Sequence, residues 1–170
     1  MVAMRKMTFI LLVMLTMTAS TGWAGEGDNY LTLHAGLLVP NTLNAQIGFE
    51  HELRYGNAWE LSFEAGNRYR KDPVCGKYCT DTFWKGYYWN GAAYYKKVLA
   101  KGKNSVFRIK GGPLLGAYKG DFNYGGEISF EYNIQLENGI QVTVTQKNQV
   151  NFKHGDDFRN GLLVGFKIPF

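Results

Sequence analysis

The amino-acid sequence predicts an all-β protein, an eight-stranded antiparallel up-and-down transmembrane β-barrel that follows a cleaved signal peptide. Three observations lead to this prediction: an apolar leader at the N-terminus, long segments in which apolar and polar residues alternate, and a final apolar run that ends on Phe. Aromatic residues make up 15% of the 170 residues and 21 residues are Gly, where an average usage of roughly 7% would give about 12. Aromatic residues are enriched in strands, so the composition favours β-structure.

Residues 1–24 have the features of a secretory signal peptide. Arg5 and Lys6 form a basic start, an apolar core follows, and small residues surround the expected cleavage point after Ala24. A transmembrane anchor is the alternative, but Thr residues interrupt the apolar core, which is shorter than the about 20 residues that a membrane helix needs. We therefore expect a mature barrel domain over residues 25–170.

The mature domain would carry 17 Lys and Arg residues and 14 Asp and Glu residues, a net charge of +3. This weak basic excess gives no reason to expect direct nucleic-acid binding. No segment after the leader is long and apolar enough for a membrane helix. A membrane location would therefore require a closed barrel, because only helices and closed barrels satisfy their backbone hydrogen bonds in lipid.

Alternation with a period of two marks the expected strands, because successive side chains of a strand point to opposite faces. In the segment 122–136, every second residue from Phe122 to Leu136 is apolar or Gly, and Glu127 and Glu131 lie on the opposite face. A helix would scatter these residues around its circumference. We expect strands at 30–39, 42–53, 57–69, 83–98, 104–118, 122–136, 138–151 and 158–170.

The individual strands differ in how clearly they alternate. The first and fourth are the least regular, and the fourth is an aromatic-rich run, whereas the second, third, fifth and seventh separate apolar from polar residues well. The strands are longer than the about 5–6 residues of ordinary soluble strands, and long enough for the about 9–11 residues of a transmembrane strand. Pro113 lacks a backbone donor, so we expect a bulge at that point of the fifth strand.

The polar faces carry charges of both signs, as expected if the side chains pair inside a barrel lumen. The predicted lumen charges are Glu50, Glu52, Glu60, Glu64, Arg108, Lys110, Glu127, Glu131 and Lys167. An eight-stranded barrel has an interior just wide enough for side chains to fill. We therefore expect these charges to plug the lumen.

The connections between the strands fall into two kinds. Tight, Gly- and Asn-containing turns are expected at 54–57, 100–104 and 137–139, and longer charged connections at 70–82 and 153–158. Bacterial outer-membrane barrels have short periplasmic turns and longer outer loops. The long connections fall on one side of the predicted barrel, which we assign to the cell exterior, although two short connections lie on that side as well.

The last strand ends on an apolar file that includes Phe166, Ile168 and Phe170. Such a terminal aromatic strand resembles the C-terminal signal that barrel-assembly machinery reads in outer-membrane proteins. We expect these three residues to face lipid, Lys167 to face the lumen, and Leu163 to be an apolar exception on the lumen side. The expected location is the bacterial outer membrane, with its lipid and the barrel-assembly machinery as partners.

A soluble β-sandwich or a lipocalin-like barrel is the alternative, because such a fold points its apolar face inward and its polar face outward. Alternation alone does not distinguish the two arrangements. The mixed charges on the polar faces, the Tyr and Trp residues near the expected strand ends and the terminal Phe favour lipid on the outside.

Two cysteines, Cys75 and Cys79, lie in the longest expected loop. In an oxidising compartment they are expected to form a small-loop disulfide. A zinc site needs about four ligands, and the sequence shows no Cys and His cluster that could supply them. We expect no metal and no cofactor.

Some eight-stranded outer-membrane barrels modify lipid A with a His and a Ser near the outer surface. His154, with Asp156 or Asp157, could contribute to such a site. The Ser residues after the leader do not match it, because Ser105 falls at the periplasmic end of its strand, and Ser62 and Ser129 fall within theirs. We therefore predict no catalytic residues and no enzyme activity.

The segment from Tyr87 to Phe170 resembles the conjugative-transposon TraO family of Bacteroidota. The resemblance rests on "YYWNGAAYYKKVLAKGKNSVFRIKGGPLLGAYKGD", "GGEISFEYNIQLENG", "QKNQV" and "NGLLVGFKIPF", which cover about half of the chain. It implies a role in the envelope-spanning apparatus of conjugative DNA transfer, with other proteins of that apparatus as partners, and it carries over no catalytic residues.

The predicted function is therefore that of a structural or accessory outer-membrane component of a conjugation system. The alternatives are a lipid A-modifying enzyme, a small adhesion or porin-like barrel, and a soluble lipocalin-like carrier.

Overall fold

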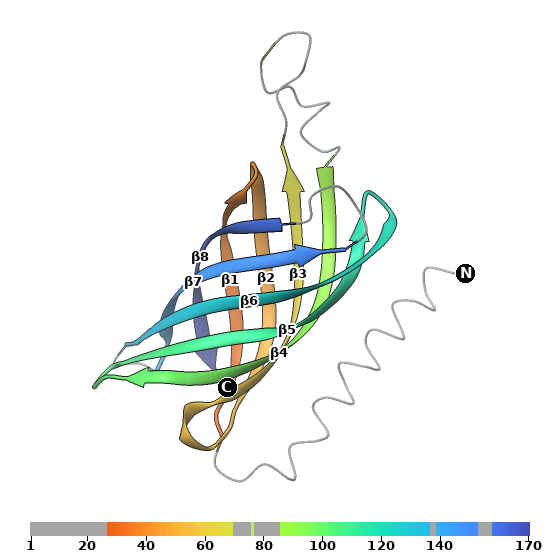
Figure 1. The fold of residues 1–170 in the computed structure, drawn as a ribbon. Helices are drawn as coiled ribbons and strands as arrows, with labels where there is room; N and C mark the ends of the chain where they lie inside the picture. The colour runs from red at the N-terminus through yellow and green to blue at the C-terminus, as the bar shows by residue number, and fades with distance from the viewer. Residues whose placement is uncertain (1–26, 70–75, 77–85, 137–138, 153–157) are drawn as a thin grey trace.

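The computed structural model describes residues 27–69, 76, 86–136, 139–152 and 158–170. Within these residues the chain forms one closed barrel in which each strand pairs antiparallel with the next and β8 pairs with β1 (Figure 1). The predicted eight-stranded up-and-down topology is confirmed. The expected signal peptide lies outside the described residues, as do Cys75 and Cys79.

The strands are long, as the alternation predicts. Their bounds are β1 (Asn29–Val39), β2 (Thr42–Glu52), β3 (Ala58–Arg68), β4 (Tyr87–Lys101), β5 (Ser105–Tyr118), β6 (Asp121–Gln135), β7 (Gln141–Asn151) and β8 (Phe158–Pro169). A short 3-10 turn, η1 (Arg54–Gly56), joins β2 to β3. Within the described residues, no helix is long and apolar enough to cross a membrane.

The two faces of the sheet differ sharply in polarity. Side chains on the outer wall, such as Leu61, Ile128 and Leu162, are apolar and exposed, whereas the charged residues of the same strands are buried inside the barrel. This distribution is the reverse of a soluble barrel, because an apolar exterior is stable in lipid and a polar interior needs only internal partners. The architecture is therefore that of a transmembrane β-barrel, and the lipocalin-like alternative is not supported.

The strand irregularity lies at a different place from the one predicted. Pro113 pairs with Gly126 of β6 in regular register. Toward β4, Ala92 pairs with Leu114 and Tyr95 pairs with Gly111 in the same register, so the missing donor interrupts the ladder but inserts no extra residue. The bulge occurs instead near the C-terminal end of β4, between Val98 and Ala100.

The backbones of β1 and β8 approach each other closely where the barrel closes. A Cβ atom added at Gly36 would collide with the carbonyl oxygen of Leu162, and one added at Gly165 would collide with the carbonyl oxygen of Leu33. The seam continues to the last residue, because the backbone N–H of Phe170 donates to the Asn29 carbonyl oxygen at 3.1 Å. Closure therefore depends on positions without side chains.

Replacing Gly165 with Ala should destabilise the barrel by about 1–3 kcal/mol, the usual cost of forcing an extra carbon into a packed position. The matched control is Gly91→Ala on β4, where an added Cβ would meet only the Leu115 carbonyl oxygen at an ordinary 3.9 Å. Urea unfolding of both variants in lipid vesicles measures the difference. Equal stability of the two variants would show that the seam is not tightly packed.

Candidate functional site in the barrel lumen

The interior of the barrel is filled by ionised side chains. The fully buried charged residues among those described are Glu50, Glu60, Glu64, Glu127, Glu131, Lys96, Arg108, Lys110, Lys147, Arg159 and Lys167. Eight of the nine predicted lumen charges are in this set. The ninth, Glu52, lies at the end of β2, where its side chain is 25% exposed. Lys96, Lys147 and Arg159 were not among the predicted charges.

Lys96 of β4 is the centre of the larger cluster. Its Nζ lies 2.5 Å from a carboxylate oxygen of Glu50, 2.5 Å from one of Glu60 and 2.7 Å from one of Glu131. These carboxylates come from β2, β3 and β6, so the ammonium group on β4 contacts its neighbour β3 and also two strands that do not pair with β4.

Two further cations complete this cluster. Lys167 of β8 reaches Glu50 at 2.8 Å and Glu131 at 2.5 Å. Arg108 of β5 donates to Glu50 at 2.8 Å through Nη1 and to Glu52 at 3.0 Å through Nη2. The guanidinium therefore links the buried cluster to the partly exposed end of β2.

A second cluster lies around Glu64 and Glu127. The Nζ of Lys147 forms an ion pair with Glu64 and lies 3.0 Å from Glu127. Lys110 lies 3.4 Å from Glu127 and 3.9 Å from Glu60, so it connects the two clusters. The Tyr94 hydroxyl donates to Glu127 at 2.6 Å, and the Lys110 ammonium sits 4.1 Å from the centre of the Tyr94 ring.

The lumen also holds aromatic and apolar side chains outside the two charge clusters. Arg159 lies over the Tyr88 ring, with its Cζ 4.0 Å from the ring centroid, and the Tyr88 hydroxyl accepts a hydrogen bond from Asn44 at 2.5 Å. Leu114 and Leu163 are buried in the interior. The expected position of Leu163, as an apolar exception on the lumen side, is confirmed.

Three of the buried carboxylates, those of Glu50, Glu60 and Glu131, lie close enough together to hold a cation, since one oxygen of each falls within 4.8 Å of the others. The Lys96 ammonium already contacts all three residues. Lys167 and Arg108 also pair with members of this set, so the protein's own three cations balance the charge of the three carboxylates.

The structure does not assemble a catalytic constellation from the described residues. Ser62 and Ser129 lie inside the barrel, where the Ser129 hydroxyl donates to Glu127 at 2.6 Å, and Ser105 is the first residue of β5. His34 is buried in the lumen wall. His154, Asp156 and Asp157 lie outside the described residues.

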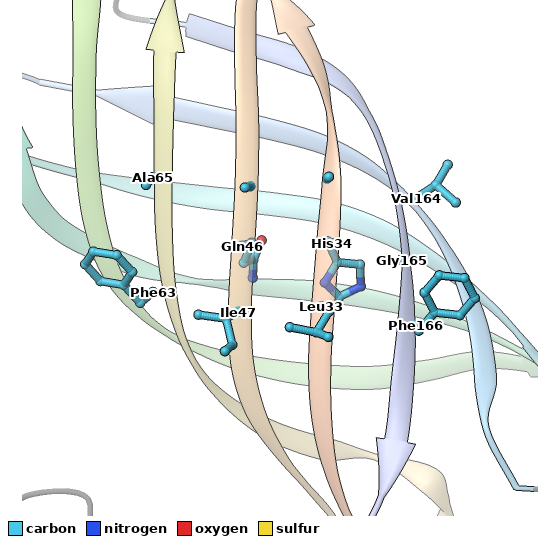
Figure 2. Close-up of a pocket in the computed structure, with 11 residues that line it drawn as sticks. Leu33, His34, Gln46, Ile47, Phe63, Ala65, Val164, Gly165 and Phe166 are labelled. Atoms are coloured by element: carbon cyan, nitrogen blue, oxygen red, sulfur yellow. The ribbon is translucent and has the colours of Figure 1, made fainter. Parts of the chain in front are cut away.

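The outer wall has shallow apolar depressions. Figure 2 shows one of about 500 Å³ over β1, β2, β3 and β8, with Leu33, Ile47, Phe63 and Phe166 at its border. Its floor is formed where Ala35, Ala45 and Ala65 face one another across three strands. Apolar side chains form most of this surface, and His34 and Gln46, which also line it, are buried. The depression is therefore part of the apolar outer wall.

The predicted C-terminal assembly residues lie on this outer wall. Phe166, Ile168 and Phe170 are exposed, and the Phe170 ring packs on Phe49 of β2 with centroids 5.8 Å apart. Lys167 points the opposite way, into the charge cluster. The terminal strand therefore presents an apolar face on the outer wall and a charged residue to the lumen.

Comparisons with known proteins support the fold and no family. No family model matches the chain, and no curated protein sequence is similar to it. Among solved structures, the barrel is similar to one described as "De novo design of transmembrane beta-barrels", with a TM-score of 0.57 and 6% identity over 86% of this chain and 98% of that chain. The likeness concerns the transmembrane barrel fold alone.

Replacing Lys96 with Met should destabilise the barrel by about 3–5 kcal/mol, because removing one partner of a buried ion pair leaves uncompensated charge behind. The matched control is Lys97→Met, whose side chain is exposed on the outside of the same strand and whose loss should change stability by no more than about 0.5 kcal/mol. Urea unfolding in vesicles compares the two. A small effect at Lys96 would contradict the central role of its ammonium.

Proposed function

We propose that the protein is a sealed outer-membrane barrel that serves as a structural or accessory component of a conjugative DNA-transfer apparatus. The charge network across the lumen is the observation that supports a sealed barrel. Lys96, Glu50 and Glu131 have no exposed side-chain surface although they are ionisable. In a conducting pore these groups would be hydrated, so we infer that the lumen does not conduct. The function is then assigned to the surfaces at the two ends of the barrel and to its outer wall.

The outer membrane is the proposed location because closed barrels with an apolar exterior and a polar interior are the form in which strands cross that membrane. The predicted signal peptide over residues 1–24 and the exposed terminal aromatic side chain of Phe170 fit export and assembly there. The proposed partners are outer-membrane lipid and the barrel-assembly machinery.

The assignment to conjugation rests on the resemblance of the segment from Tyr87 to Phe170 to the TraO family. A sealed barrel suits an accessory role, because the transferred DNA would have no path through its lumen. The protein would then contact other members of the apparatus through its ends or its wall, without catalysis and without binding DNA directly.

The purified, folded protein should give no steady ion current in a planar lipid bilayer, because the lumen side chains of Lys96, Lys147 and Lys167 are fully buried among carboxylates. A wide-pore porin in the same bilayer is the positive control. Heat-modifiable gel migration shows that the sample is folded. Reproducible single-channel steps from the folded protein would rule out a sealed barrel.

Deleting the gene from its host element should lower the frequency of conjugative transfer, and the wild-type gene supplied separately should restore it. The His154→Ala variant should restore transfer equally well and leave the mass of lipid A unchanged, because the proposed role needs no catalysis. Normal transfer from the deletion strain would refute the conjugation assignment. A lipid A mass that depends on His154 would favour the enzyme instead.

A further inference from the structure

A group of amide side chains lies on the lipid-facing wall, where most neighbours are apolar. Gln146 and Asn148 of β7 and Asn160 of β8 form this amide cluster. Asn148 pairs with Ile128 across the β6–β7 ladder, and Asn160 pairs with Val39 across the β1–β8 ladder. Both apolar partners are exposed on the outer wall. Directly paired residues share a face of the sheet, so the cluster points toward lipid.

The three amides are hydrogen-bonded to one another. Asn160 Nδ2 donates to Asn148 Oδ1 at 2.5 Å, and Asn148 Nδ2 donates to Gln146 Oε1 at 2.9 Å. Gln146 Nε2 donates to Asn148 Oδ1 at 3.0 Å. Each amide group offers two N–H donors and an oxygen with two acceptor positions. Asn148 Nδ2 also donates to the Ile128 carbonyl oxygen at 3.1 Å, so both donors and both acceptor positions of Asn148 are used. The hydrogen-bonding capacity that the cluster does not use within itself lies on Gln146 and Asn160.

Exposed apolar residues lie on both sides of the amide cluster. Along β7, exposed Val144 precedes the cluster and exposed Val150 follows it, and Phe152 continues the apolar surface beyond. On β8, exposed Phe158 and Leu162 flank Asn160. Hydrocarbon offers no hydrogen-bond partner, so a wall that faced only lipid would gain nothing from amides at these positions.

A groove adjoins the cluster on the β6 side. It has a volume of about 630 Å³ and is lined by Asn148, by Gly126 and Pro113 at its floor, and by Ile128 and Phe158 at its borders. Residues without long side chains leave the backbone near the surface, and small residues are what allow close contacts between proteins in membranes. Polar groups and close-approach residues thus occupy one part of the wall.

We propose that the amide cluster and the adjoining groove form the contact surface for a second copy of this chain in the membrane. Amides both donate and accept, so the cluster is complementary to itself. Two copies inserted in the same orientation can be related by a two-fold axis along the membrane normal, which places the same patch of each copy in contact at the same depth. The proposal requires a membrane-inserted barrel but is independent of the role in conjugation.

Cysteine cross-linking tests the proposal in a Cys75→Ser/Cys79→Ser background. Leu162→Cys lies on the outer wall directly opposite Gln146, and Leu61→Cys lies on the outer wall of β3, four strands from β7 in the barrel order. Oxidation of the folded protein in dilute phosphatidylcholine vesicles should trap a dimer through the first position and not through the second. Equal cross-linking at both positions, or none at the first, would overturn the proposal.

A second comparison separates the amides from general crowding. Asn148→Leu/Asn160→Leu in the Leu162→Cys protein should lower the amount of trapped dimer by about tenfold, because the variant loses the hydrogen bonds between the two membrane-spanning barrels. Tyr132→Leu, also on the lipid face, is the matched control and should leave the dimer unchanged. Heat-modifiable migration confirms folding, and Asn148→Ala alone replaces the double variant if that variant does not fold.

Persistence of the dimer in the leucine variant would overturn the proposal. The proposal would also be overturned if Leu162→Cys formed adducts only with other proteins in native membranes and no dimer in vesicles. The amide cluster would then contact a different protein rather than a second copy of this chain.

Discussion

The fold depends on the contact between the Lys96 ammonium and the carboxylates of Glu50, Glu60 and Glu131. An isolated charge inside a barrel of this width would be deprived of water, so each of these groups is stable only because the others are present. The four side chains come from β4, β2, β3 and β6. Their mutual neutralisation allows the outer wall to be apolar without a hydrated lumen.

Much of this arrangement can be predicted from the sequence, because the period-two alternation that identifies a strand also identifies which of its residues share one face. The polar faces of the second, third, fifth and sixth strands predict Glu50, Glu60, Arg108 and Glu127 correctly as residues of one face. Which of the two faces is inside cannot be read from alternation. The structure places the charged face inside and the apolar face outside.

Of the lumen cations that were not predicted, Lys147 lies on a regularly alternating strand, whereas Lys96 lies where the periodicity is weak. Lys96 belongs to "YYKKV", where aromatic and basic residues occur on both faces, so neither Lys is distinguishable from the other by pattern. The amide of Asn148 on the outer wall was not predicted from the sequence either. Its pairing with exposed Ile128 shows that this side chain points toward lipid. Pro113 shows the reverse case, since a missing donor was tolerated without a bulge.

The ion pairs also constrain the order in which the protein can assemble. Lys167 lies on the last strand, yet its partners Glu50 and Glu131 are supplied by β2 and β6. Until β8 is in place, these carboxylates lack one of their counter-ions, and lipid cannot solvate them. Stepwise entry of single hairpins into the bilayer would expose bare charge, so insertion and closure should be a concerted event in which the lumen dries only as the final strand docks.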